Sequence, residues 1–158
     1  MRPRFFLGRT MRIQDTVFKT CKEQGEWAEL CFMAKAAGMG LKVLRPFGDS
    51  SSYDVGVELP DRILRIQVKS TNRRRAGTRS YALHLHDWKA EQYAKGTIDF
   101  FAVYLIPVDI WYILPFDVTG VSTALHFTPG GRCEKHKQYR EAWHLLRPQP
   151  TLPSQTLS

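Results

Sequence analysis

Cysteine is scarce in this sequence, and long apolar runs are missing. The 158 residues include three cysteines (Cys21, Cys31 and Cys133) and no CxxC pair, which excludes a disulfide framework. No apolar stretch approaches the roughly 20 residues that span a bilayer. The apolar patch Phe5–Leu7 is far shorter than the roughly 7–15 residues of a signal peptide's apolar region. We therefore expect a soluble, cytoplasmic protein with no membrane partner.

Two common enzyme signatures are absent as well. The sequence has no glycine-rich phosphate loop and no GxSxG motif, which argues against an NTPase and against a serine hydrolase. Hydrophobic residues make up 43% of the chain and charged residues 24%, which is typical of a chain with a packed core. The size fits one domain, which we place at residues 1–146, followed by a proline-rich flexible tail at residues 147–158.

Acidic residues are missing from one long central segment. Arg62–Arg79 contains seven Lys and Arg side chains and no Asp or Glu, and the first 14 residues add four arginines, again without an acid. These two segments account for more than the net charge of +8 of the whole chain. A concentrated positive patch attracts polyanions and releases counterions from nucleic acid. The segment predicts a nucleic-acid contact, with a solubilising surface as the plain alternative.

Hydrophobic periodicity predicts an α/β fold. Strands that alternate apolar and polar residues lie between helical segments, which is typical of a mixed sheet flanked by helices. The predicted helices are Thr16–Ala37, His86–Lys95 and Glu134–Leu146. The predicted strands are Leu41–Phe47, Tyr53–Leu59, Arg62–Lys69, Tyr81–Leu85, Ile98–Ile106 and Ile110–Phe116.

Two adjacent strands carry enough pattern to predict their register. Tyr53–Leu59 and Arg62–Lys69 are separated only by Pro60-Asp61, so a two-residue turn pairs Val55 with Ile66. Pro-Asp is not a favoured pair for such a turn, so a shift of one residue or a bulge stays open. In this register one face of the hairpin is apolar and carries Tyr53, Val55, Val57, Leu64, Ile66 and Val68.

The other face of the hairpin carries a chemically suggestive triple. Asp54 lies opposite Gln67, and Lys69 follows two residues later on the same face. A carboxylate and an amide carbonyl are hard oxygen ligands suited to Mg²⁺. A neighbouring ammonium can orient a water or neutralise a phosphate. Such triples also occur in solvated hairpins without any site.

The first helix offers a further carboxylate. Glu29 has Phe32, Met33 and Ala36 as its neighbours along one side of the predicted helix, so its carboxylate projects along a largely apolar face. Carboxylates are seldom placed there without a cation, a metal or a hydrogen-bond donor. Glu26, one turn earlier, is an alternative. A plain salt bridge from Glu29 to Lys69 or Arg65 is the structural alternative.

Other residues allow weaker predictions. Cys133, His136 and His144 suggest zinc, but no fourth ligand is evident. Asp99, at the start of an apolar strand, suits a structural role. Trp111 offers apolar material either for the core or for a contact between subunits.

The pieces of this pattern resemble a known family. They occur in the order and with the spacing of the PD-(D/E)XK nuclease superfamily, and they are most similar to the small subgroup of group I intron-encoded homing endonucleases. The matching segments, within about Gly25–Leu146, are Gly25–Glu29, Pro46–Asp49, Tyr53–Val55, Arg65–Ser70, Ile98–Tyr104, Trp111–Pro115 and Tyr139–Trp143.

This resemblance implies roles for single residues. Glu29 would be the helix-borne acid, Asp54 the central metal-binding aspartate and Lys69 the lysine of the final motif. Gln67 stands where most of the superfamily has Asp or Glu, which removes a negative charge and should weaken metal affinity. The homing-endonuclease subgroup resembles this sequence in having Gln there.

The implied function is a Mg²⁺-dependent endonuclease with a restriction-endonuclease-like core that hydrolyses double-stranded DNA, as a homing-type enzyme. Glu29, Asp54 and Gln67 would hold the metal and, together with Lys69, form the catalytic site. Because cutting both strands calls for two active sites, we expect a homodimer or homotetramer. The alternatives are a junction-resolving or restriction-type nuclease, and a non-catalytic DNA-binding protein with the same fold. The residues expected on DNA phosphates are Arg73, Arg74, Arg75 and Arg79.

Overall fold

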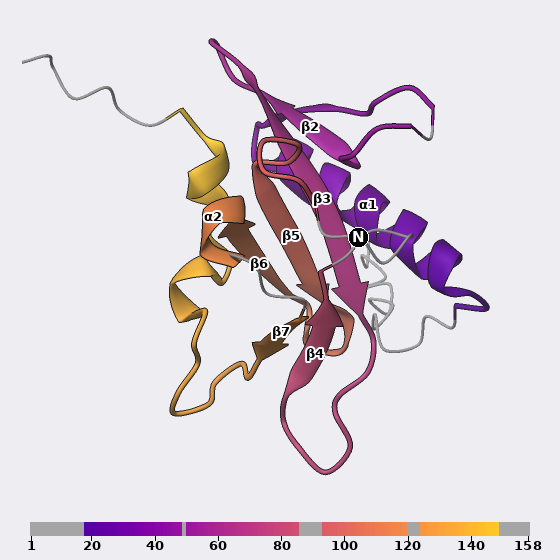
Figure 1. Ribbon diagram of the computed structural model, residues 1–158, viewed down its shortest axis with the longest axis vertical. Helices are drawn as coiled ribbons and strands as arrows, with labels where there is room; N and C mark the ends of the chain where they lie inside the picture. The colour runs from indigo at the N-terminus through magenta and orange to yellow at the C-terminus, as the bar shows by residue number, and fades with distance from the viewer. Residues whose placement is uncertain (1–17, 49, 86–92, 120–123, 149–158) are drawn as a thin grey trace, which may run out of the picture.

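The computed structural model describes residues 18–48, 50–85, 93–119 and 124–148 (Figure 1). Its regular elements are α1 (Cys21–Gly38), β1 (Lys42–Leu44), β2 (Val55–Glu58), β3 (Ile63–Thr71), β4 (Tyr81–His84), β5 (Phe100–Leu105), β6 (Ile110–Pro115), α2 (Phe116–Thr119) and β7 (Ala124–Phe127). Three short 3₁₀ turns complete them: Ile106–Val108, Lys137–Tyr139 and Trp143–Leu146. Among the helices of these described ranges, none is long and apolar enough to span a bilayer.

The sheet confirms the predicted fold class. Five strands lie in the order β1-β2-β3-β5-β6, with β3 and β5 parallel and the other neighbouring pairs antiparallel. A second, two-stranded antiparallel sheet of β4 and β7 lies at the lower end of the view in Figure 1. The protein is therefore an α/β fold with a mixed sheet, as the alternating sequence pattern predicts.

Helix α1 begins later than predicted. Thr20 caps the helix, because its hydroxyl accepts a hydrogen bond from the Glu23 N–H at 3.1 Å. The Glu23 carboxylate in turn accepts from the Lys19 N–H at 2.8 Å, so both side chains hold the chain at this end. Residues 18–20 are thus outside the helix, and residues 16 and 17 lie outside the described ranges. The predicted end is confirmed, since α1 ends at Gly38 and Gly40, two residues later, adopts a positive φ of 80°.

The register of the β2–β3 hairpin is the predicted one over its length. Val55 pairs with Ile66 and Val57 with Leu64. At the open end, however, the Asp54 N–H also donates to the Ile66 carbonyl at 2.9 Å, one residue out of register, which is the signature of a β-bulge. The bulge reverses the alternation before Val55. Tyr53, predicted on the apolar face with Val55, therefore packs against the opposite side of the sheet.

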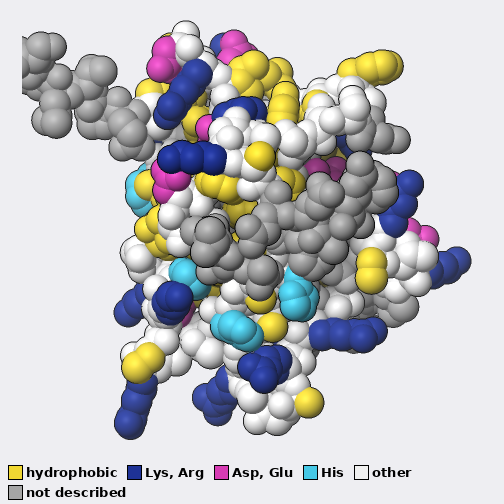
Figure 2. All heavy atoms as spheres, in the orientation of Figure 1, with side chains coloured by type: hydrophobic (Ala, Val, Ile, Leu, Met, Phe, Trp, Pro, Cys, Tyr) yellow, Lys and Arg dark blue, Asp and Glu magenta, His cyan; other side chains and the backbone are white. Residues whose placement is uncertain are grey.

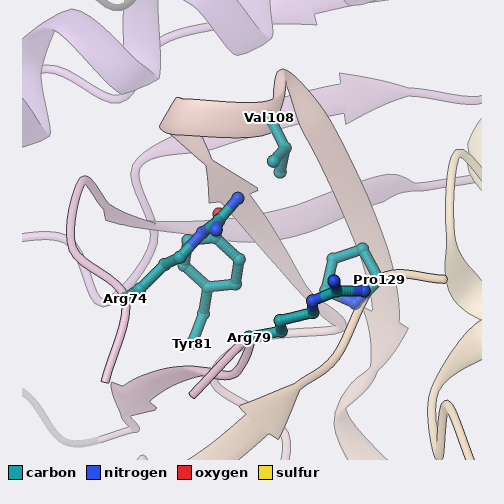
Figure 3. Close-up of a pocket in the computed structure, with 5 residues that line it drawn as sticks. All are labelled: Arg74, Arg79, Tyr81, Val108 and Pro129. Atoms are coloured by element: carbon teal, nitrogen blue, oxygen red, sulfur yellow. The ribbon is translucent and has the colours of Figure 1, made fainter. Parts of the chain in front are cut away.

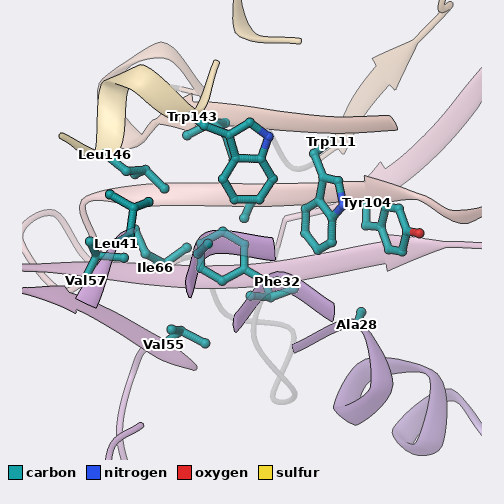
Figure 4. Close-up of a cluster of buried hydrophobic side chains, with 14 of the residues drawn as sticks. Ala28, Phe32, Leu41, Val55, Val57, Ile66, Tyr104, Trp111, Trp143 and Leu146 are labelled. Atoms are coloured by element: carbon teal, nitrogen blue, oxygen red, sulfur yellow. The ribbon is translucent and has the colours of Figure 1, made fainter. Parts of the chain in front are cut away.

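Each face of the sheet has its own apolar core. On one face, Ala28, Phe32 and Ala36 of α1 pack against the inward residues of β2, β3, β5 and β6, together with the last 3₁₀ turn (Figure 4). The other face is covered by the two-stranded sheet, and that core consists of Tyr81, Leu83, Leu85, Ile98, Phe101, Val103, Leu105, Tyr112, Leu114, Leu125 and Phe127. Trp111 and Tyr112 both belong to these cores, so they are not surface contacts.

The predicted helix Glu134–Leu146 is wrong. The segment forms two 3₁₀ turns separated by an extended Arg140 and by Glu141, which has a positive φ of 50°. Glu141 holds this reversal because its backbone N–H donates to the Trp111 carbonyl, while its carboxylate accepts from the Trp111 N–H at 2.8 Å and from the Trp143 indole at 2.7 Å. Contacts to a distant strand thus override the local helical spacing.

The remaining differences concern short elements. Strand β7 and the single turn α2 were not predicted, because four residues each carry too little periodicity. Most of the predicted helix His86–Lys95 lies outside the described residues, and residues 93–95 are not helical.

Candidate active site

Asp54 and Gln67 meet directly, as the hairpin pattern predicts. The Gln67 side-chain amide donates to Asp54 Oδ2 at 2.6 Å, and the Val68 backbone N–H donates to the same oxygen at 2.8 Å. The bulge at Asp54 produces this arrangement. Just before β2 begins, the Asp54 carboxylate takes the place of a strand neighbour and accepts the hydrogen bond of the Val68 N–H in β3. Asp54 is thereby held rigidly against the middle of β3.

Lys69 lies on the same face of β3 as Gln67. Its ammonium is positioned over the ring of Tyr93, 5.3 Å from the ring centre, and its charge favours the ionised form of Asp54. The aromatic face thus holds the cation near the carboxylate. The sequence did not predict the contact with Tyr93, because Tyr93 lies in the connection between β4 and β5 and no periodic pattern links it to Lys69.

Glu29 approaches from α1, and its ion-pair partner differs from the predicted ones. The Glu29 carboxylate lies 3.7 Å from the guanidinium of Arg45, which directly follows β1. The alternative acid, Glu26, is exposed and pairs with Lys22 at 3.8 Å. Arg45 was missed, because nothing in the spacing of the sequence links the end of β1 to the middle of α1.

Arg65 has a structural role in place of the proposed bridge to Glu29. Its guanidinium binds both oxygens of Asp99, at 3.0 and 3.1 Å, and its backbone N–H donates to Asp99 Oδ2 at 2.7 Å. These contacts lock β3 to the start of β5 and confirm the structural reading of Asp99.

Burial disfavours the charged forms of both Glu29 and Asp54. Burial, followed by repulsion from Asp54, raises the pKa of Glu29 to about 7, although the Arg45 cation lowers it. Burial also raises the pKa of Asp54, against the opposing effects of the Val68 N–H, Lys69 and Gln67. A bound cation close to both carboxylates would favour their charged forms.

This donor set fits a hard divalent cation. Asp54 and Glu29 offer carboxylate oxygens, and Gln67, which turns its nitrogen to Asp54, offers a carbonyl oxygen. Within residues 18–48, 50–85, 93–119 and 124–148, no group of three or more His, Cys, Asp or Glu side chains could hold a metal ion. Gln67 would therefore have to serve as the third protein ligand. Because Cys133, His136 and His144 do not form such a group either, the prediction of a zinc site there is wrong. His136 is buried and packs against Phe127.

The four predicted DNA-binding arginines lie together beyond the end of β3. Arg73, Arg74, Arg75 and Arg79 are all exposed in the connection from β3 to β4. Lys and Arg side chains gather over the lower part of the face seen in Figure 2, where this connection lies. The structure thus places the predicted cations near the strand that carries Gln67 and Lys69.

The raised pKa of Glu29 predicts a pH-dependent stability. Because folded Glu29 binds its proton more tightly than the unfolded chain, its charge destabilises the fold increasingly as pH rises from about 4.5 to 7. In EDTA, Glu29→Gln should therefore raise the free energy of unfolding at pH 8 by about 2 kcal/mol and change it little at pH 4.5.

The measurement is urea denaturation at both pH values, with Glu26→Gln as the matched control. The exposed Glu26 should give the same small change at both. Equal stability of Glu29→Gln and the wild type at pH 8 would contradict the assignment of a buried, repelled carboxylate.

Comparisons with known proteins bear on the whole domain. Residues 19–146 match the family described as PD-(D/E)XK endonuclease. No curated protein matches the sequence. The structure of the bacterial homing endonuclease I-Ssp6803I is similar, with a TM-score of 0.69 and 26% identity over 82% of this chain and 92% of that chain. The Holliday junction resolvase Hjc of Archaeoglobus fulgidus shares 19% identity over 66% of this chain and 84% of that chain, with a TM-score of 0.46.

Proposed function

Because this chain belongs to the PD-(D/E)XK endonuclease family and is a nuclease by that membership, we propose that it hydrolyses phosphodiester bonds of double-stranded DNA in a Mg²⁺-dependent reaction. The observation that carries the proposal is the hydrogen bond between Asp54 and Gln67 within the matched region, with Lys69 and Glu29 close enough to interact electrostatically with Asp54. The net charge of +8 and the exposed arginines that follow β3 supply the attraction to DNA.

The side chains of the site would have different roles, which follow from their chemistry. Asp54, Glu29 and the Gln67 carbonyl would hold the cation. When bound, Mg²⁺ would polarise a phosphoryl oxygen and lower the pKa of an attacking water. Lys69 brings a positive charge to the place where the phosphate gains negative charge, and Tyr93 restricts its position. Val68 fixes Asp54 through its backbone N–H, so the ligand carboxylate needs no rearrangement.

Cleavage of supercoiled plasmid by the pure protein tests this proposal. We expect linear or nicked DNA with Mg²⁺ and none with EDTA. DNA binding without cleavage under any divalent cation would favour the non-catalytic alternative. One observation speaks for that alternative, because Gln67 replaces an acid and leaves the site with two carboxylates.

The homing-type reading is supported by the similarity to I-Ssp6803I over most of both chains. Digestion of a random-sequence library distinguishes it from restriction-type cleavage, because a homing-type enzyme selects a long site and a restriction-type enzyme a short one. A junction-resolving enzyme would cut branched DNA and leave linear duplexes intact.

We also propose that the active form is a homodimer or homotetramer. Two strands are cut by two active sites, and exposed apolar side chains offer contact surface, above all Phe47, which is fully exposed. Light scattering at micromolar concentration should give at least twice the 18.2 kDa mass of one chain. A monomer would contradict this part of the proposal.

A further inference from the structure

A pocket of about 370 Å³ lies beyond the end of β3, outside the candidate active site. Three separate segments converge on it: the β3–β4 connection with the first residue of β4, the turn between β5 and β6, and the residues after β7. Its size is within the range of small-ligand sites. Figure 3 shows the lining residues, which are Arg74, Arg79, Tyr81, Val108 and Pro129.

The loop that carries the two arginines is held by its own hydrogen bonds. The Arg75 N–H donates to the Ser80 carbonyl at 2.8 Å, and the Thr78 N–H donates to the Arg75 carbonyl at 3.1 Å. This closed turn places Arg74 just before its first residue and Arg79 inside it. The backbone that carries both arginines is therefore held in one conformation, with their guanidinium groups at the pocket.

Arg74 is also oriented by a buried aromatic side chain. Its Nε donates to the Tyr81 hydroxyl at 2.9 Å, and its guanidinium lies over the Tyr81 ring, 5.8 Å from the ring centre. Tyr81 is only 1% exposed, so it is an immobile support. A guanidinium held in this way loses less conformational freedom when it binds an anion.

The chemistry of the lining selects a particular ligand. Two of the five lining residues are cationic and none is acidic, while Val108 and Pro129 supply apolar surface. Paired guanidinium groups recognise a phosphate, and apolar side chains suit the carbon face of a sugar ring. The lining thus matches one sugar-phosphate unit of a nucleic-acid strand.

We propose that this pocket binds one sugar-phosphate unit of the DNA, with its phosphate on Arg74 and Arg79, next to the cleavage site; this inference rests on the proposed function. Arg74 follows Lys69 by five residues, which span at most about 17 Å of extended chain. With a rise of about 3.4 Å per base along one strand, this backbone separation corresponds to at most about five base steps. The pocket would fix the register of the flanking DNA.

The test is the affinity for a fluorescent 30-base-pair duplex of mixed sequence, measured by anisotropy in EDTA over a range of salt concentrations. Arg79→Ala should weaken binding about tenfold and reduce the slope of log K against log salt by about 0.9. The matched control is Arg62→Ala, which removes the same charge from an exposed position at the opposite end of β3. It should change the affinity less than about twofold.

Tyr81→Phe tests whether DNA binding depends on the orientation of Arg74 or only on its positive charge. It keeps every charge but removes the hydroxyl that orients Arg74, so we expect about threefold weaker binding with an unchanged salt slope. Unchanged affinity of Tyr81→Phe, or equal effects of Arg79→Ala and Arg62→Ala, would overturn the proposal. If the wild type itself neither binds nor cuts DNA, the proposed function fails instead. The thermal unfolding of each variant verifies its fold.

Discussion

Replacing Asp54 with asparagine should abolish DNA cleavage, by at least about 10²–10³-fold, and leave DNA affinity unchanged or higher. Asparagine keeps the shape of the side chain and a carbonyl oxygen for the Gln67 and Val68 donors, so the hairpin is preserved. What it removes is the charge that would hold a divalent cation. The lost negative charge also repelled the DNA phosphate, which is why binding should not weaken.

The measurements are plasmid cleavage in Mg²⁺ and duplex binding in EDTA. Glu58→Gln is the matched control, because it removes one carboxylate from an exposed position on the same hairpin strand. It should cut DNA at the wild-type rate. If Asp54→Asn cuts as fast as this control, the metal-site assignment is wrong.

Two companion variants examine the neighbours of Asp54. Lys69→Ala should also stop cleavage but lower DNA affinity slightly, because it removes a cation. Gln67→Glu restores the common superfamily pattern and should keep metal binding. Since it sets two buried carboxylates against each other where Gln67 now donates at 2.6 Å, it should destabilise the metal-free protein. Added Mg²⁺ should then raise its melting temperature more than that of the wild type.

Replacing Trp111 with alanine should have the largest effect on stability, a loss of about 3–5 kcal/mol. The Trp111 indole is 1% exposed and stacks on Tyr104 with ring centres 4.2 Å apart. It also touches Phe32 of α1 and Trp143 of the last 3₁₀ turn, each at 5.7 Å between ring centres (Figure 4). The substitution leaves a cavity where helix, sheet and C-terminal segment meet.

Urea denaturation followed by circular dichroism measures this loss. Lys22→Ala is the control, because it truncates a side chain of α1 that is 85% exposed and should change stability by less than about 0.5 kcal/mol. Since a domain of this kind is stable by only about 5–15 kcal/mol, the Trp111 variant should be close to unfolding. A loss below about 1 kcal/mol would contradict the central position of Trp111 in this core.

The sequence by itself determined the β2–β3 hairpin, its register and the contact of Asp54 with Gln67. It also determined the two apolar strands β5 and β6 and the end of α1 at its glycines. These features depend on alternation and turn residues within a short stretch of chain, and a register shift of one residue would expose the whole apolar face of the hairpin. The local pattern and the energy of burial therefore point to the same arrangement.

The tertiary structure alone decided the rest. It selected Arg45 as the partner of Glu29, turned Tyr53 to the other face through the bulge at Asp54, and replaced the expected C-terminal helix by a reversal at Glu141. The Arg45 and Glu141 contacts depend on groups that meet only after the sheet has formed, and the bulge depends on the Asp54 carboxylate binding the β3 backbone. Burial makes an unpaired carboxylate or backbone N–H costly, so such partners override the local pattern, and a single sequence carries no periodic signal that identifies them.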